Sequence, residues 1–169
     1  MSPRGASSCY TDPMNKVKRR KVVAVSGGFD PIHIGHVRMF QEAKALGDEL
    51  VVILNNDNWL ADKKGRPFMP GVEREEIIQA IKGVDRVVLT DHVPGDPDRS
   101  VCRALRAIHP DIFANGGDRK PDGDPVPEVE LCNELGIKLV YNVGQGGKVQ
   151  SSSWLIAKAA QPLPTTASH

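Results

Sequence analysis

Two histidines three residues apart, His33 and His36, stand where an apolar segment ends and a helical pattern begins. Such a junction presents backbone N–H groups and the partial positive charge of a helix start, which favours phosphate binding. A spacing of three places both imidazoles on one side of the first helical turn. Their ring nitrogens can then donate hydrogen bonds to phosphate oxygens as negative charge grows there during a reaction at phosphorus. The pair predicts phosphate chemistry, with helix capping or part of a metal site as alternatives.

The residues before the histidines favour a ligand that approaches the backbone. Gly27 and Gly28 remove side chains at the end of the apolar segment, so a bulky ligand can come close there. Asp30 and the proline after it predict a rigid turn. The turn leads directly into the helical pattern that carries the two imidazoles.

Alternating strand and helix patterns predict how these residues are positioned. Apolar runs typical of buried parallel strands occupy 22–25, 49–54, 86–89, 111–114 and 138–141. Helical patterns occupy 35–46, 71–82, 98–108, 125–135 and 151–160. We expect an α/β fold, a single Rossmann-like, doubly wound, five-stranded parallel sheet with helices on both faces. Ligands of such sheets bind beyond the carboxyl ends of the strands, where the loops converge.

Composition predicts a single soluble domain in the cytoplasm. The 169 residues carry 22 basic and 21 acidic side chains, so no net field favours a nucleic acid or an anionic membrane as partner. Three cysteines without a CxxC pair indicate a reducing compartment. No apolar run is long enough to span a membrane, and no signal peptide is apparent. We expect a domain at 21–160, between disordered tails at 1–20 and 161–169.

A longer motif surrounds the histidines and resembles a known family. Residues 26–36 read SGGFDPIHIGH, similar to the G-x-F-D-x-x-H-x-G-H signature of the nucleotidyltransferase superfamily and its cytidylyltransferase-like family. That family includes glycerol-3-phosphate cytidylyltransferase and the adenylyltransferase domain that forms ADP-heptose. Further segments resemble the family in the same order, namely AKALGDELVVILNND, RPFMPGVEREEIIQAIKGVDRVV, DIFANGGDR and VQSSSWLI.

The resemblance implies transfer of a nucleoside monophosphate from an NTP to a small phosphate- or phosphonate-bearing acceptor, with release of pyrophosphate. It also implies Mg²⁺ bound with the NTP, no metal held by the protein alone, and a homodimer. Compact length favours CTP slightly, whereas RPFMP and GGD resemble the heptose-type adenylyltransferases and keep ATP as the alternative. A catalytically silent nucleotide-binding module is the alternative from another class. A class I aminoacyl-tRNA synthetase shares the HIGH tetrapeptide, but no KMSKS-like segment is present.

The resemblance further assigns roles to individual residues. The expected catalytic residues are His33 and His36, with a lysine from the loop after the second strand, Lys63 or Lys64. The expected nucleotide-binding residues are Gly27, Gly28, Phe29, Asp30, Gly35, Gly116, Gly117, Asp118, Ser151, Ser152 and Ser153. The acceptor's phosphate is expected to meet Arg74, Arg119 and Lys120.

Each assignment has an ordinary structural alternative. The lysines can be solvated, Arg74 can form a surface salt bridge with a nearby glutamate, and residues 116–118 can form a plain turn. One of the serines is a good N-cap for the helix that follows. Relatives of the glycerol-phosphate type carry an arginine just before that helix, where only Lys148 stands here. The identity of the acceptor therefore stays open.

Overall fold

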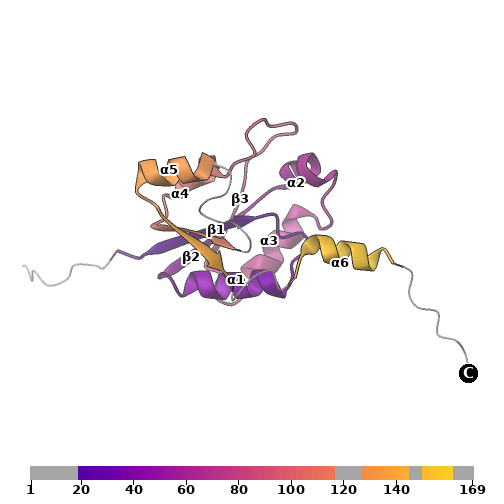
Figure 1. Cartoon of the computed structure of the whole chain (residues 1–169), viewed down its shortest axis with the longest axis horizontal. Helices are drawn as coiled ribbons and strands as arrows, with labels where there is room; N and C mark the ends of the chain where they lie inside the picture. Colours follow the sequence, from indigo (N-terminus) through magenta and orange to yellow (C-terminus); the bar gives the residue numbers. More distant parts are fainter. Residues whose placement is uncertain (1–18, 117–126, 145–149, 162–169) are drawn as a thin grey trace, which may run out of the picture.

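The computed structural model describes residues 19–116, 127–144 and 150–161. Within these ranges one sheet contains the strands β1 (Val22–Gly27), β2 (Glu49–Leu54), β3 (Arg86–Leu89), β4 (Ile112–Gly116) and β5 (Lys138–Val143). The helices are α1 (Ile34–Lys44), α2 (Asp57–Lys64), α3 (Gly71–Gln79), α4 (Cys102–Ile108), α5 (Pro127–Leu135) and α6 (Ser152–Ala159). Figure 1 shows how they are arranged around the sheet.

The strands lie in the order β3-β2-β1-β4-β5, and every neighbouring pair is parallel. β1 pairs with β2 on one side and with β4 on the other, so the direction of winding changes beside β1. In sheets of this kind the crevice for a ligand opens at that point, beyond the carboxyl ends of the strands. The predicted five-stranded, Rossmann-like parallel sheet is confirmed.

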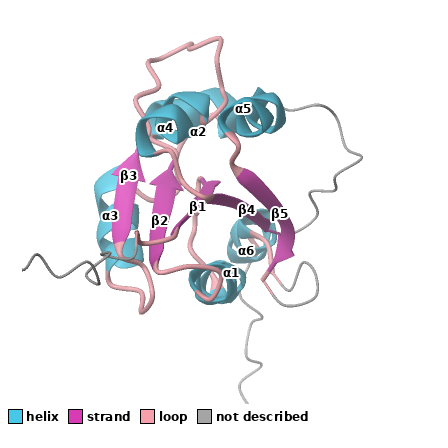
Figure 2. Cartoon of the chain, turned by 90° about the vertical axis from the view of Figure 1, so that its left-hand side faces the viewer, coloured by secondary structure: helices cyan, strands magenta, loops and turns pink. Residues whose placement is uncertain are grey.

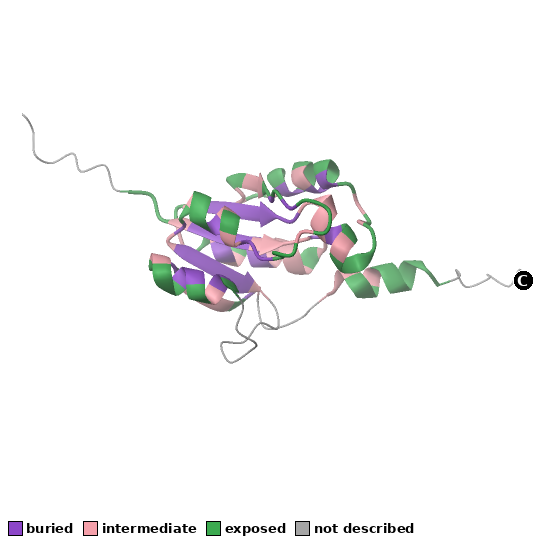
Figure 3. Ribbon diagram, turned by 90° about the horizontal axis from the view of Figure 1, so that it is seen from above, coloured by how far each residue is buried: buried purple, intermediate pink, exposed green. Residues whose placement is uncertain are grey.

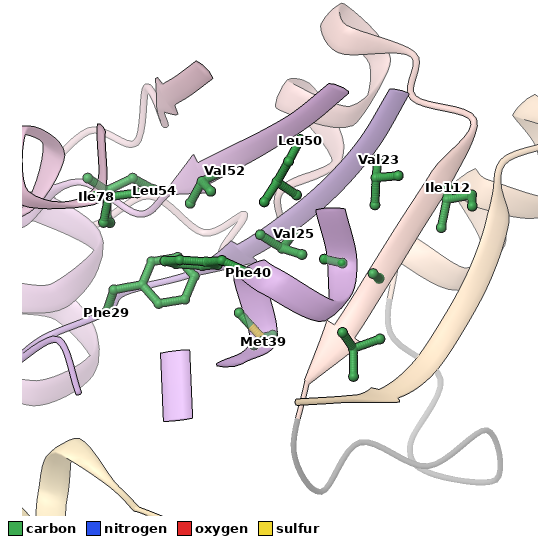
Figure 4. Packing of buried hydrophobic residues seen from close by; sticks show 13 residues of the cluster. Val23, Val25, Phe29, Met39, Phe40, Leu50, Val52, Leu54, Ile78 and Ile112 are labelled. Carbon is green, nitrogen blue, oxygen red and sulfur yellow. The ribbon is translucent and has the colours of Figure 1, made fainter. Parts of the chain in front are cut away.

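Helices cover both faces of the sheet, as Figure 2 shows. On one face α1 and α3 pack against alternate strand residues, with Phe40 and Ile78 fully buried among Leu50 and its neighbours (Figure 4). On the other face α4 and α5 contribute Leu105 and Leu131 to a second apolar cluster. Buried strands such as β2 can be almost wholly apolar because both faces are covered.

One helix was not expected from the sequence. Residues 55–70 were predicted to form a loop, but α2 occupies most of its first half, so Lys63 and Lys64 end a helix and do not lie in a loop. α2 buries only Leu60 and therefore lacks the apolar stripe that marks a helix in a sequence. Asn56 begins it, because the Asn56 side chain accepts a hydrogen bond from the Trp59 N–H at 3.0 Å.

The described residues begin slightly before the predicted start of the domain. Arg19 already forms an ion pair with Asp111 at 2.7 Å, two residues before the expected start, while residues 1–18 and 162–169 lie outside the described residues. α6 buries none of its residues and projects away from the sheet (Figure 3). None of the helices in the described ranges is long and apolar enough to cross a membrane.

The two cysteines that the structure describes, Cys102 and Cys132, are free thiols. Burial raises the pKa of both, and it raises the pKa of Cys132 to about 11. Both side chains are therefore protonated at neutral pH, which makes them poor nucleophiles and poor metal ligands.

Candidate active site

The two histidines begin α1 at the carboxyl end of β1, and each one caps the helix through Nδ1. His33 is the N-cap residue, with extended backbone, and its Nδ1 accepts the Gly35 N–H at 3.1 Å. The Nδ1 of His36 accepts the His33 N–H at 3.3 Å, which completes a reciprocal capping box. Because both Nδ1 atoms accept, the hydrogen of each neutral ring is on Nε2.

The rings are fixed by stacking as well as by hydrogen bonds. Their centroids lie 3.7 Å apart with 22° between the planes. His36 also meets the ring of Phe29 edge-on at 4.9 Å, and Phe29 meets Phe40 in the same way at 5.0 Å. Phe40 belongs to the buried core, where its ring meets that of Phe29 (Figure 4), so the packing of the fold supports the imidazole pair through Phe29.

Both imidazoles are neutral at physiological pH. Burial, as the largest cause, together with repulsion from His33 and from Lys64, lowers the pKa of His36 to about 3. Burial also lowers the pKa of His33. The site thus presents two uncharged Nε2–H donors side by side, suited to hydrogen bonding rather than to proton transfer. The capping alternative and the phosphate interpretation are compatible, since Nδ1 caps the helix while Nε2 has no hydrogen-bond partner among the residues that the structure describes.

The low pKa of His36 predicts how stability changes with pH. Between about 3 and the ordinary value of 6.5, the unfolded chain binds a proton that the folded chain excludes. Stability should therefore fall as pH decreases through this window, by roughly 1.4 kcal/mol per pH unit from this one group. Urea unfolding of the wild type and of His36→Gln, at about pH 7 and about pH 4.5, measures the difference. The variant should lose less stability; an equal loss would assign the effect to other groups.

Asp30 anchors the loop between β1 and α1. Its carboxylate is buried, and its two oxygens accept the backbone N–H groups of Phe68 and Met69, both at 2.7 Å. These bonds tie the loop to the segment before α3. The Asp30 side chain is 1% exposed and already has partners, and the nucleotide contact expected of Asp30 stays a prediction.

Arg74 has the opposite environment from the one expected. Its side chain is 0% exposed, and the guanidinium donates to the carbonyl oxygens of Gly28 (2.7 Å), Asn55 (2.8 Å) and Met69 (3.0 Å). It also forms an ion pair with Asp57 at 2.6 Å. The alternative of a surface salt bridge with a glutamate is wrong, whereas the expected contact with the acceptor stays a prediction, made by a side chain that is buried in this structure. Arg74 instead joins the ends of β1 and β2 from inside the protein.

The structure separates the two candidate lysines. Lys64 Nζ donates to the carbonyl oxygen of Asp30 at 3.3 Å, and its charge contributes to the low pKa of His36. Lys63 Nζ lies 4.4 Å from the centroid of the Trp59 ring, in a cation–π contact. Lys64 is therefore the lysine beside the histidines, a choice that the sequence left open.

The glycines of the site are required by the protein's own packing. A Cβ atom on Gly27 would lie 2.9 Å from the Phe29 ring, and one on Gly28 would lie 2.8 Å from Leu60. At Gly116, which ends β4, a Cβ atom would overlap the sulfur of Met39. Gly35 is equally tight, with the His33 ring at 3.0 Å. These contacts explain the glycines without a ligand, and the nucleotide contacts expected for them and for the Phe29 backbone stay predictions.

α6 is joined to the histidine loop through Ser152, whose Oγ donates to the Pro31 carbonyl at 2.9 Å. Ser151 is the N-cap residue of α6 by position, but its side chain makes no capping hydrogen bond, and Ser153 is exposed. The serines therefore lie beside the predicted phosphate site. The remaining expected site residues lie outside the described residues, namely Gly117, Asp118, Arg119 and Lys120.

The sequence did not predict a polar network at the carboxyl ends of β2 and β3. Asn56 donates from its backbone to Thr90 Oγ1 at 3.0 Å and from its side chain to the His92 carbonyl at 2.8 Å. The buried His92 ring bridges Thr90 Oγ1 (2.9 Å) and the Ser100 carbonyl (3.1 Å). The signal in the sequence was the pair of asparagines directly after the apolar run of β2. This network holds the segment after β3 against α2.

Comparisons with known proteins agree with this geometry. The chain matches a family model described as "Cytidylyltransferase-like" over residues 24–136. The FAD synthase of Pyrococcus abyssi is 37% identical over 122 residues, which is 72% of this chain and 78% of that protein. The bifunctional protein HldE of Streptomyces coelicolor is 37% identical over 142 residues, which is 83% of this chain but 28% of HldE.

A solved structure points in the same direction. The crystal structure of the lipopolysaccharide core biosynthesis protein from Thermoplasma volcanium has a TM-score of 0.61 and 28% sequence identity, covering 76% of this chain and all of that chain. The family match spans more than half of the sequence and includes the imidazole pair at the start of α1. The protein therefore belongs to the cytidylyltransferase-like family and is a nucleotidyltransferase.

Proposed function

We propose that this protein is an adenylyltransferase, which moves AMP from ATP to the phosphate group of a polyol phosphate. An oxygen of the acceptor's phosphate attacks the α-phosphorus of ATP and forms a new P–O bond. The bond from that phosphorus to the bridging oxygen of the β-phosphate breaks, and its electron pair leaves with pyrophosphate. No covalent intermediate with the protein is needed, so catalysis depends on positioning and charge stabilisation.

The observation that carries the proposal is the pair of neutral Nε2–H donors at the α1 start. The Nδ1 atoms of His33 and His36 are already occupied by backbone N–H groups, which aims each ring through its opposite nitrogen. Oxygens of the triphosphate would accept from these donors, beside the positive end of the α1 helix dipole. Lys64, beside His36, would add positive charge as pyrophosphate departs.

The relatives favour ATP over the CTP that chain length slightly suggested. FAD consists of FMN joined to AMP, so an FAD synthase transfers an adenylyl group. The adenylyltransferase domain of HldE, which forms ADP-heptose, transfers the same group. The name of the family model describes the shared domain and does not by itself choose a base.

FMN is the first candidate acceptor, because the matched FAD synthases are of similar extent to this chain, which covers 73% of one and 78% of another. A heptose phosphate is the second candidate. The alignment with HldE extends over 83% of this chain, more than the 72% shared with the Pyrococcus abyssi FAD synthase. Both acceptors are phosphate monoesters or glycosyl phosphates that carry several hydroxyl groups.

Mg²⁺ is proposed to arrive with ATP as part of the substrate. In the part of the chain that the structure describes, no three His, Cys, Asp or Glu side chains form a group that could hold a metal. Mg²⁺ commonly keeps several waters and takes phosphate oxygens as ligands, so a protein cage is not required. The homodimer expected from the family stays a prediction.

The test offers the purified protein the Mg²⁺ complexes of ATP, CTP, GTP and UTP, each with FMN, a heptose 1-phosphate or glycerol 3-phosphate. We expect pyrophosphate release with ATP, and a product whose mass equals the acceptor plus AMP minus water. A preference for CTP would overturn the assignment of the nucleotide. Binding of nucleotides without turnover of any acceptor would favour the catalytically silent module.

A further inference from the structure

Of the helices that the structure describes, only α6 buries none of its residues. It is also short, with eight residues. Isolated helices of fewer than roughly 12–15 residues are marginal in water, and a helix in a protein is stabilised mostly by the packing of its apolar face. α6 therefore has little packing of its own to fix its place on the protein.

The contacts that fix α6 lie at its start. Ser152 is the first residue of the helix, and its Oγ donates to the Pro31 carbonyl at 2.9 Å. A Cβ atom on Gly35 would lie 4.0 Å from the carbonyl oxygen of Gln150, so the chain just before α6 lies against the start of α1. Figure 1 shows α6 beside one end of α1. Both contacts are made with the segment that carries the imidazole pair.

The hydrogen bond to Pro31 uses the hydrogen of the Ser152 hydroxyl. A hydroxyl has one hydrogen to donate, and a carbonyl oxygen can only accept. Phosphate oxygens need donors as well, so this hydroxyl does not donate to a phosphate while it is bonded to Pro31. The geometry thus gives Ser152 a partner within the protein, at the loop that precedes the histidines.

We propose that Ser152 is a positioning residue that anchors the start of α6 to the histidine loop, residues 28–33. It acts on the reaction through the helix that it holds and not through a contact with the phosphates. This inference rests on the proposed function, because the helix start that Ser152 anchors is expected to bind the triphosphate.

Two helix starts lie close together at this anchor, which couples it to an anion. α1 begins at Ile34 and α6 at Ser152. Each helix start carries a partial positive charge of roughly half an elementary charge, so the two starts repel each other. A triphosphate beside both would offset that repulsion. Docking of α6 and binding of ATP then favour each other, and each strengthens the other by the same factor.

Hydrogen exchange of the free protein tests the anchor without any substrate. Mass spectrometry follows amide exchange in peptides that cover residues 150–161, in the wild type and in Ser152→Ala. We expect this segment to exchange roughly 3- to 10-fold faster in the variant, the factor that corresponds to one neutral hydrogen bond. Peptides of β1 and β2 should exchange as in the wild type. Ser153→Ala is the matched control, because it removes an exposed hydroxyl from the next residue and should leave the exchange of α6 unchanged.

Kinetics separate the anchor from a direct contact with the reacting phosphates. Ser152→Ala should raise the KM for ATP roughly 3- to 10-fold and change kcat at saturating ATP by less than about twofold, because bound ATP restores the docking of α6. Ser152→Thr keeps a hydroxyl and should recover most of the loss. Gln161→Ala, at an exposed position just after α6, should match the wild type. The melting temperature of Ser152→Ala should not change, since α6 adds no buried residue to the core.

The outcomes distinguish the inference from the proposed function. If the wild type transfers AMP but α6 of free Ser152→Ala exchanges at the wild-type rate, the anchor is wrong and the proposed function stands. A large fall of kcat with an unchanged KM would assign the hydroxyl to the transition state and would also overturn the anchor. If α6 exchanges faster in Ser152→Ala but the wild type adenylylates no acceptor, the anchor stands and the proposed function falls.

Discussion

Exchange of His33 for asparagine should lower kcat by roughly a hundred- to a thousand-fold while the fold stays intact. The Nδ1 of His33 caps α1 by accepting from Gly35, and asparagine is among the best N-cap residues, so its Oδ1 can replace that acceptor. Asparagine does not extend to the position of Nε2. The substitution therefore removes the donor that faces the phosphates and leaves the helix start complete. Steady-state kinetics and the melting temperature, measured on the same preparation, give the two quantities.

His36→Gln provides the same separation at the second ring. Glutamine at the third position of a helix accepts from the N-cap N–H in a capping box, which is the role that His36 Nδ1 has here. We expect a comparable loss of kcat for this variant. His33→Ala is the matched control, because it removes the cap as well and should lose about 1 kcal/mol of stability in addition to activity.

The outcome that would contradict the role of the histidines is equally definite. If His33→Asn and His36→Gln both keep wild-type kcat while His33→Ala loses stability, the imidazoles serve only as caps. In that case the stacking of the two rings at 3.7 Å would be a feature of the helix start and not of catalysis.

The sequence predicted the parts of this molecule that depend on local pattern. β2 and β3 match the predicted ranges, because an unbroken apolar run is what a strand needs when helices cover both faces of a parallel sheet. The start of α1 was predicted from the strand, the turn and the spacing of His33 and His36. Patterns of this kind are properties of neighbouring residues and need no knowledge of the rest of the fold.

The parts that were missed depend on contacts between distant segments. α2 has no apolar stripe, and only its end signals mark it, Asn56 before the first turn and Lys63 and Lys64 in the last. Burial of the Asp30 side chain was not predicted because its partners, the N–H groups of Phe68 and Met69, lie 38 and 39 residues away. A charged residue in a sequence is usually exposed, so burial of this kind is visible only in the folded chain.

Arg74 is the clearest case of a charged residue whose burial the sequence did not predict. Its replacement should have the largest effect on stability. Arg74→Met is expected to lower the free energy of unfolding by roughly 3–5 kcal/mol. Methionine fills much of the space, but three carbonyl oxygens and the Asp57 carboxylate lose their donor, and two of those carbonyls are at the ends of the loops around the site. Arg74→Lys should lose less, since one ammonium group keeps the charge but cannot reach all four acceptors. Urea unfolding at neutral pH measures both.

Arg106→Met is the matched control, because Arg106 also pairs with an acidic residue, Glu134, but with its side chain 56% exposed. An exposed ion pair contributes little, so this variant should change stability by less than about 1 kcal/mol.

The expectation from the sequence, that Arg74 binds the acceptor, makes the opposite prediction. It requires Arg74→Met to unfold like the wild type while the KM for the acceptor rises and the KM for ATP does not. The Arg74 guanidinium is 0% exposed and bonds to the carbonyl oxygens of Gly28 and Asn55, so it links stability to activity. In Arg74→Met the loops that it joins lose their support, and both substrates should be bound less well.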